Sequence, residues 1–90
     1  MLPCSPMDQP YFFYLLRCSD GSLYAGICID LEQRIKVHQN GKGAKYTRSR
    51  LPVTLVYDEQ HPSKGNALRR EAEVKKWSKK GKERLVVNAT

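Results

Sequence analysis

The sequence predicts a single small domain of mixed structure, an α/β (α+β) fold. Its 90 residues are too few for two separate hydrophobic cores, and a content of 40% hydrophobic and 28% charged residues is typical of a globular protein. β-prone runs and segments with apolar residues at helical spacing follow one another along the chain. A two-domain protein and a collagen-like or wholly disordered chain are therefore excluded.

The first ten residues differ from the rest of the chain. They include three prolines and show no periodicity, and proline cannot donate a ladder hydrogen bond. We therefore expect a disordered leader over residues 1–10, one domain over residues 11–87 and a short tail over residues 88–90.

Hydropathy and cysteine usage indicate a cytoplasmic protein with no membrane partner. No apolar run approaches the roughly 18 residues that span a bilayer, and the apolar stretch at residues 11–16 is shorter than a signal-peptide core. Cys4, Cys18 and Cys28 lack the spacing of a disulfide framework or a zinc site, so we expect reduced thiols.

A hairpin is predicted at the start of the domain. Residues 11–17 and 22–29 are β-prone, and Ser19-Asp20-Gly21 between them is a turn signal. If this turn is a three-residue loop with Gly21 left-handed, facing residue numbers sum to 40, and Tyr14 and Tyr24 share one face of the hairpin. A two-residue Asp20-Gly21 turn would place the tyrosines on opposite faces.

The next segment predicts a short helix. Asp30 is placed to cap it, Gln33 occupies the capping-box position, and Asn40-Gly41 is a stop signal. Arg34 and His38 lie four residues apart, so they project from the same side of this helix.

A connection and a third strand follow this helix. Residues 41–50 contain two glycines and four basic residues with little apolar content, which predicts a mobile connection rather than a regular element. Residues 53–57 are all β-branched, leucine or tyrosine, and this composition predicts a strand.

Two helices are predicted beyond a chain break at residues 61–63. Ser78 is placed to cap the last of them, over residues 79–86, which Leu85 and Val86 would anchor. The first has a stripe that includes one acid, and an inward carboxylate needs a partner. The stripe consists of Ala67, Leu68, Glu71, Val74, Lys75 and Ser78.

Charge is unevenly distributed along the chain. Residues 1–41 carry three basic and four acidic side chains, whereas residues 42–90 carry thirteen and five, for a total net charge of +7. Such a basic half favours a nucleic-acid backbone as partner, although a solvated surface accounts for many basic runs. The candidate DNA-contacting residues are Lys42, Lys45, Arg48 and Arg50, with Tyr46 among them to stack on an exposed base.

The order of several short motifs resembles a known family. The motifs are Phe12-Phe13-Tyr14, then Tyr24-Ala25-Gly26, then Arg34 with His38, then Gly41-x-Gly43-Ala44-x-x-Thr47. Over roughly residues 11–87, this order is similar to that of the GIY-YIG nuclease superfamily, in its small single-domain YhbQ-like branch.

The resemblance implies a three-stranded antiparallel sheet flanked by helices and metal-dependent cleavage of DNA. It implies Mg²⁺ or another divalent metal as cofactor. By matching positions, it assigns Tyr14, Tyr24, Arg34 and His38 as catalytic residues, Gly26 as the motif glycine and Glu71 as the metal ligand.

Three positions depart from the family pattern. Phe12 replaces the first motif glycine, Ala25 replaces an isoleucine, and Glu83 stands where many relatives carry an asparagine. The first two are side-chain changes near the site that would narrow or reshape access of the substrate. We do not transfer the role of the asparagine to Glu83.

We expect a metal-dependent DNA endonuclease with little sequence preference, since no helix-turn-helix or zinc-finger pattern offers base-edge readout. Structure-selective cleavage in DNA repair or processing is the corresponding role. The alternative is a non-catalytic nucleic-acid-binding module that retains the nuclease fold, which Phe12 and the missing asparagine favour. No sequence feature identifies a protein partner.

Overall fold

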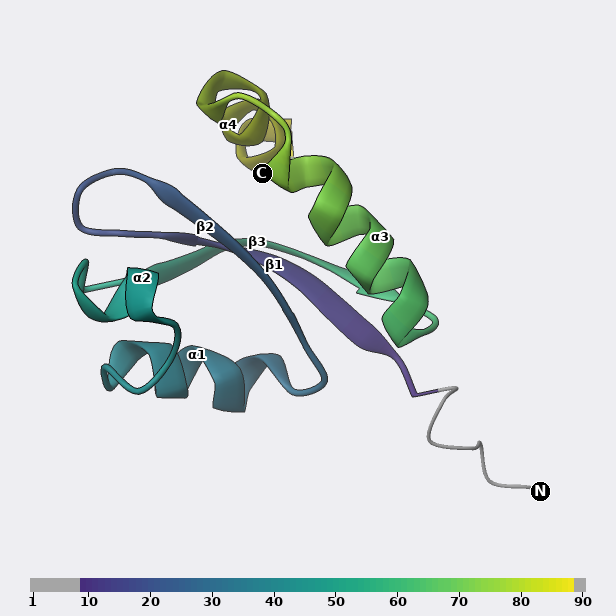
Figure 1. The fold of residues 1–90 in the computed structure, drawn as a ribbon, viewed down its shortest axis with the longest axis horizontal. Helices are drawn as coiled ribbons and strands as arrows, with labels where there is room; N and C mark the ends of the chain where they lie inside the picture. The colour runs from purple at the N-terminus through teal and green to yellow at the C-terminus, as the bar shows by residue number, and fades with distance from the viewer. Residues whose placement is uncertain (1–8, 89–90) are drawn as a thin grey trace.

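The computed structural model describes residues 9–88 of the chain, which form one three-stranded sheet (Figure 1). The strands are β1 (Tyr11–Arg17), β2 (Leu23–Cys28) and β3 (Thr54–His61), in the order β2-β1-β3. Both outer strands run antiparallel to β1. The predicted antiparallel sheet is therefore confirmed, whereas most of the predicted leader, Cys4 and the last two residues lie outside the described residues.

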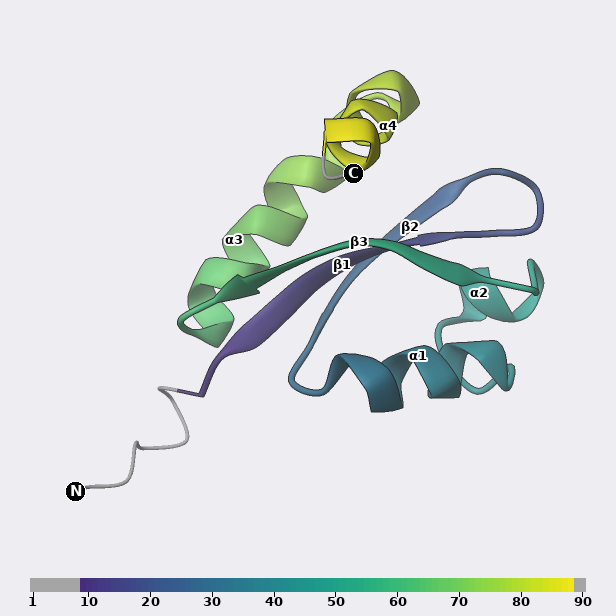
Figure 2. The ribbon, with the colours of Figure 1, turned by 180° about the vertical axis from the view of Figure 1, so that it is seen from behind.

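Helices cover both faces of this sheet. The helix α1 spans Leu31–Gln39, α2 spans Lys45–Arg48, α3 spans Lys64–Lys75 and α4 spans Lys79–Asn88. In Figures 1 and 2, α1 and α2 lie on one side of the strands, and α3 and α4 lie on the other. The result is a layered α/β domain with two separate helix–sheet interfaces.

The hairpin has the register that places both tyrosines on one face. Gly21 has a φ of 85°, and Tyr14 pairs with Gly26 while Leu16 pairs with Tyr24. The three-residue loop is therefore confirmed.

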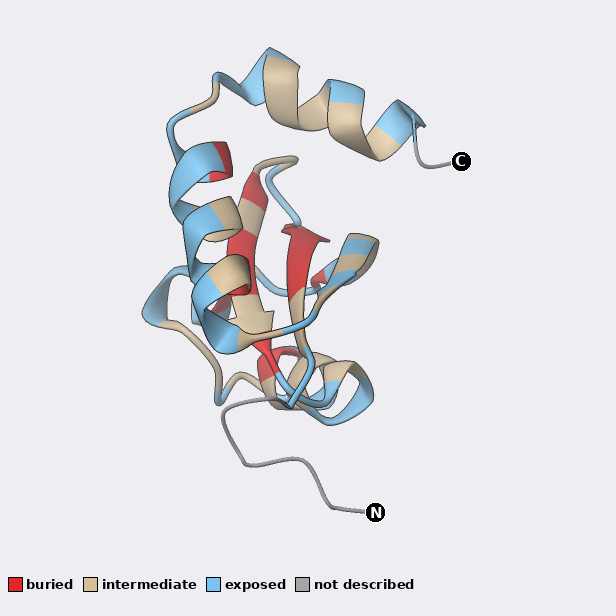
Figure 3. Ribbon diagram, turned by 90° about the vertical axis from the view of Figure 1, so that its right-hand side faces the viewer, coloured by how far each residue is buried: buried red, intermediate tan, exposed pale blue. Residues whose placement is uncertain are grey.

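Side chains alternate between the two faces of the sheet and form two core clusters. Tyr14, Leu16 and Val53 belong to the cluster on the α1 side, against which Tyr24 packs. Phe13 and Leu15 belong to the cluster on the α3 side. Figure 3 shows the buried residues concentrated on the strands between the helices.

Helix α1 begins and ends as the sequence predicts. The side chain of Asp30 accepts a hydrogen bond of 3.1 Å from the Gln33 amide. Asn40 is the C-cap, and Gly41 follows it with a φ of 75°. Since both ends are fixed by local bonds, the side chains of this helix are held in register with the sheet.

The prediction that residues 41–50 contain no regular element is wrong. The segment contains α2, whose Thr47 is fully buried. Arg50 ties its end to the hairpin, because its carbonyl accepts a 2.9 Å hydrogen bond from the Ser19 amide. The low apolar content of the segment was misleading, since a threonine hydroxyl and an aromatic ring anchor it instead of aliphatic side chains.

Strand β3 is longer than the predicted run at residues 53–57, because it continues to His61. Its polar second half, residues 58–61, pairs with the first half of β1. A register shift between Leu15 and Leu16 separates this pairing from that of the apolar half. Glu59, which a β-propensity argument disfavours, is held by Arg70 of α3 at 2.8 Å. Pairing with β1 and the ion pair between Glu59 and Arg70 thus extend β3 beyond its apolar residues.

The stripe predicted for α3 is only partly correct. Ala67 and Val74 are fully buried, but Leu68 is 43% exposed, and the helix ends at Lys75, before Ser78. Trp77, just beyond the helix, provides an apolar contact where the predicted stripe would continue, since it packs against the cluster on the α3 side. The turn after α3 therefore redirects the chain earlier than helical spacing suggests.

Helix α4 closes the second face as expected. Leu85 and Val86 pack against the core, and the Ser78 hydroxyl accepts a 3.2 Å hydrogen bond from the Gly81 amide. The Glu83 carboxylate accepts hydrogen bonds from Nη1 and Nη2 of Arg17 at the end of β1. These bonds lower the pKa of Glu83 to about 2. Glu83 therefore docks α4 on the sheet.

Gly26 is required by the buried phenol opposite it. A Cβ atom at this position would lie 2.5 Å from the Tyr14 hydroxyl. We expect Gly26→Ala to lower the free energy of unfolding in urea by about 1–3 kcal/mol, because the ring cannot shift within the packed core. Gly65→Ala is the control, since the nearest atom to its Cβ would be 3.9 Å away. Equal losses for the two variants would contradict this role.

Candidate active site

A continuous hydrogen-bonded chain of three buried side chains connects β1, α1 and α2. The hydroxyl of Tyr14 lies 3.0 Å from Nε2 of His38, and Nδ1 of His38 lies 2.9 Å from the Thr47 hydroxyl. None of the three is more than 1% exposed. The resemblance placed Thr47 in a motif without giving it a role, so sequence reasoning missed it; its fixed spacing from His38 was the only available signal.

Two glycines make room for this chain. Gly26 lies against the Tyr14 phenol, and Gly43 lies so close to Nδ1 of His38 that any side chain there would overlap the ring. Glycine backbone therefore confines one side of the phenol and one side of the imidazole. This confinement explains why glycine follows Ala25 in β2 and precedes Ala44.

Burial keeps the phenol and the imidazole uncharged. Desolvation raises the pKa of Tyr14 to about 12, although the neighbouring Arg34 guanidinium lowers it in part. Desolvation and the charge of Arg34 both lower the pKa of His38 below its ordinary value of 6.5. A neutral phenol bonded to a neutral imidazole is thus the resting state near pH 7.

Arg34 differs from the other half-buried arginines. Arg17, Arg50 and Arg70 each pair with a carboxylate, whereas Arg34 has no ion pair within residues 9–88. Its guanidinium instead lies beside the Tyr14 phenol. A partly buried guanidinium without a carboxylate is suited to binding an external anion, and its planar fork matches phosphate oxygens.

Tyr24 presents its hydroxyl differently from Tyr14. Its ring lies between the rings of His38, at a centroid distance of 5.5 Å, and Tyr46, at 5.9 Å. In the described part of the chain, its hydroxyl has no hydrogen-bond partner, and the residue is half-buried. The ring is thus fixed while the hydroxyl stays available to a water or a phosphate.

Two of the predicted DNA-contacting residues are already engaged with the protein. The Arg50 guanidinium lies 3.8 Å from the centre of the Tyr46 ring and also pairs with Asp20 at 3.0 Å. Tyr46 stacks on Tyr24. For these two residues, base stacking or phosphate binding would compete with existing contacts. Lys42, Lys45 and Arg48 are exposed.

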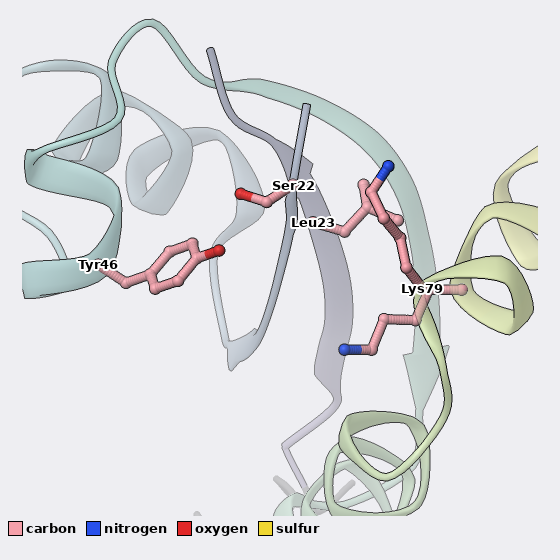
Figure 4. Close-up of a pocket in the computed structure, with 5 residues that line it drawn as sticks. Ser22, Leu23, Tyr46 and Lys79 are labelled. Carbon is pink, nitrogen blue, oxygen red and sulfur yellow. The ribbon is translucent and has the colours of Figure 1, made fainter. Parts of the chain in front are cut away.

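A small basic recess adjoins Tyr46. It has a volume of about 170 Å³ and is lined by Ser22, Leu23, Tyr46, Lys79 and Lys82. Figure 4 shows that Tyr46 of α2 and Lys79 of α4 approach it from opposite sides. At this recess, Lys79 and Lys82 of α4 lie near the β2 edge of the sheet, where Tyr46 stacks on Tyr24.

Glu71 lies apart from the chain of buried residues. It belongs to α3, on the other side of the sheet, and its carboxylate pairs with Lys75 at 3.4 Å. Its side chain is 20% exposed, and residues 9–88 contain no group of three metal-ligating side chains. A single carboxylate fits Mg²⁺, which keeps several waters and is usually shared with substrate phosphates, but it does not fit an all-protein metal cage.

The described residues include no helix long and apolar enough to cross a membrane. Cys18 and Cys28 are buried free thiols, as predicted.

Comparisons with known proteins agree with this architecture. The model of the GIY-YIG catalytic domain matches residues 10–84. The chain is 54% identical over 76 residues to a UPF0213 protein of Streptococcus sanguinis, covering 84% of this chain and 87% of that protein. It is 50% identical over 80 residues to a UPF0213 protein of Staphylococcus saprophyticus, covering 89% and 96%.

Two solved structures share the fold. The solution structure of a UPF0213 protein from Bacillus halodurans has a TM-score of 0.57 at 50% identity, covering 87% of this chain and 83% of that chain. The solution structure of a protein from E. faecalis has a TM-score of 0.61 at 37% identity, covering 88% and 84%. The predicted membership is confirmed: the chain belongs to the GIY-YIG family, among the small UPF0213 proteins.

Proposed function

We propose that this protein is a metal-dependent DNA endonuclease that hydrolyses phosphodiester bonds with little sequence preference. The observation that supports this most directly is Arg34, a half-buried cation beside the Tyr14 phenol that has no carboxylate partner among residues 9–88. Membership in a family whose shared domain is described as catalytic supports the same conclusion. Action on branched or nicked DNA in repair or processing, in the cytoplasm, completes the proposal.

The two tyrosines have different roles in this proposal. The pKa of Tyr14, about 12, makes a buried phenolate costly, so this residue acts as a fixed neutral hydrogen-bonding group. Tyr24 has an available hydroxyl and orients the attacking water. Arg34 holds the oxygens of the scissile phosphate and stabilises the charge that develops on them.

Glu71 would hold the metal ion. When bound, a divalent cation supplies charge stabilisation and a polarised water near neutral pH. Glu71 lies on the α3 side of the sheet and Arg34 on the α1 side, so a metal ion at Glu71 would act on the phosphate at Arg34 only around the edge of the sheet. Basic residues on both sides of the sheet would contact the flanking DNA backbone: the exposed Lys42, Lys45, Arg48 and Lys79, and the half-buried Lys82.

One observation favours the alternative of a non-catalytic nucleic-acid-binding module. Glu71 is paired with Lys75, and it belongs to no group of three metal-ligating side chains within the described residues. Incubation of the purified chain with branched, flapped and nicked DNA, with and without Mg²⁺, separates the two functions. Metal-dependent cuts support the nuclease, and binding without cuts under any divalent metal supports the module.

Arg34→Lys should lower the cleavage rate about a hundredfold or more. Lysine retains the charge but loses the planar fork, and the lost transition-state contact is worth about 3 kcal/mol. The rate is measured with saturating DNA. Arg84→Lys, on the exposed face of α4, is the matched control and should leave the rate unchanged. Equal rates for the Arg34 variant and the unmodified chain would remove Arg34 from the reaction.

Glu71→Gln should abolish Mg²⁺-dependent cleavage while DNA binding persists or becomes tighter. Glutamine keeps the size of the side chain but lacks the charge that a hard cation needs, and one negative charge near the DNA is gone. Cleavage and binding are measured separately, by gel assay and by fluorescence anisotropy. Glu73→Gln, two residues away and 58% exposed, is the control that should retain cleavage. Full cleavage by the Glu71 variant would exclude its metal role.

The exposed cations of α2 should bind phosphates rather than bases. Replacing both Lys45 and Arg48 by alanine should weaken binding equally for unrelated sequences, and it should make the slope of log affinity against log salt shallower by roughly one to two units. Titrations at four salt concentrations give the slope. An unchanged slope would place α2 outside the interface.

A further inference from the structure

Thr47 has one proton to donate and two neighbours that compete for it. Its hydroxyl oxygen lies 2.9 Å from the carbonyl oxygen of Ala44 and 2.9 Å from Nδ1 of His38. A carbonyl oxygen can only accept. Both contacts are hydrogen bonds at once only if Thr47 donates to Ala44 and accepts a proton from Nδ1 of His38.

The other end of the chain depends on this choice. With the proton on Nδ1, the neutral imidazole has its lone pair on Nε2, which accepts from the Tyr14 hydroxyl at 3.0 Å. In the reverse arrangement, Nε2 would donate to Tyr14, whose own proton would then need another acceptor. The neighbouring Arg34 cannot provide one, since a guanidinium only donates. Within the described part of the chain, the reverse arrangement therefore leaves a phenol that is 1% exposed with an unpaired proton.

Packing removes other ways to satisfy these groups. Gly43 presses its backbone against the Nδ1 edge of the ring, so a rotated imidazole would require this segment to move. The Tyr24 ring covers another side of the imidazole. Position, ring orientation and proton direction are thus determined together.

We propose that Thr47 is a positioning residue of the nuclease site: it holds His38 in the Nδ1-protonated tautomer, which commits the only proton of Tyr14 to His38. The phenol oxygen then offers lone pairs alone to the side of Arg34. Thr47 acts through His38 and touches no substrate. The inference rests on the proposed function for its catalytic consequence, but the tautomer itself is a property of the free protein.

The tautomer can be measured directly in the ¹⁵N-labelled full chain. Long-range ¹⁵N–¹H correlation spectra distinguish a protonated Nδ1 from a protonated Nε2, and His61→Gln identifies which of the two histidines gives each signal. We expect a protonated Nδ1 for His38 at pH 7.5 in the wild-type chain and in Thr47→Ser, which retains the hydroxyl. Thr47→Val has the same shape without an acceptor, so its His38 should shift towards the Nε2-protonated form.

Kinetics test the consequence for the reaction. Thr47→Val should lower kcat about tenfold, the value of roughly one hydrogen bond, with KM for DNA unchanged, and Thr47→Ser should recover most of the rate. Thr54→Val, an exposed threonine at the start of β3, is the matched control and should leave both tautomer and rate unchanged.

Two results would overturn the inference. One is an Nε2-protonated His38 in the wild-type chain, which needs no variant and so holds even if Thr47→Val does not fold. The other is a folded Thr47→Val with the wild-type tautomer and rate. The spectra are recorded without substrate, so failure of the proposed function is seen separately: a chain with the Nδ1-protonated tautomer that cuts no DNA would overturn the nuclease and leave the tautomer assignment supported.

Discussion

Burial of the Tyr14 phenol and the His38 imidazole is the constraint on which this small domain depends. Two polar rings that are at most 1% exposed are costly unless each polar atom has a partner. That requirement connects β1 to α1 and, through Thr47, to α2. One strand and two helices are therefore held by one chain of bonds, and a segment with few apolar residues becomes part of the core.

The strands, the hairpin register and the caps of α1 could be predicted because each depends on residues close in sequence. The turn at Asp20 and Gly21 selects the loop that gives Tyr14 its partner Gly26, and the Asp30 side chain caps the start of α1. The errors occur where distant partners decide. α2 is stabilised by His38 and Tyr24, and the second half of β3 by Arg70, and no local pattern indicates either contact.

The candidate site shows the same division. Alternation within the hairpin predicts that Tyr14 and Tyr24 share a face, and helical spacing predicts that Arg34 and His38 share a side. The exposure and partners of each side chain are not predictable in this way. Only the structure separates Arg34, which has no carboxylate partner in the described part of the chain, from Arg50, which is engaged with Asp20 and the Tyr46 ring. The roles of these residues in catalysis remain predictions.

The sheet lies between Arg34 and Glu71, and this arrangement limits how the two residues could act on the same phosphate. Arg34 is next to Tyr14 on the α1 side, and Glu71 is bonded to Lys75 on the α3 side. Packed side chains on both faces of the sheet separate the two groups, so Glu71 would reach a phosphate held by Arg34 only around the edge of the sheet. If Glu71 is the metal ligand proposed above, its contact with the 54% exposed Lys75 is a surface ion pair worth about 0.2–1 kcal/mol, so a divalent cation would displace the lysine at little cost.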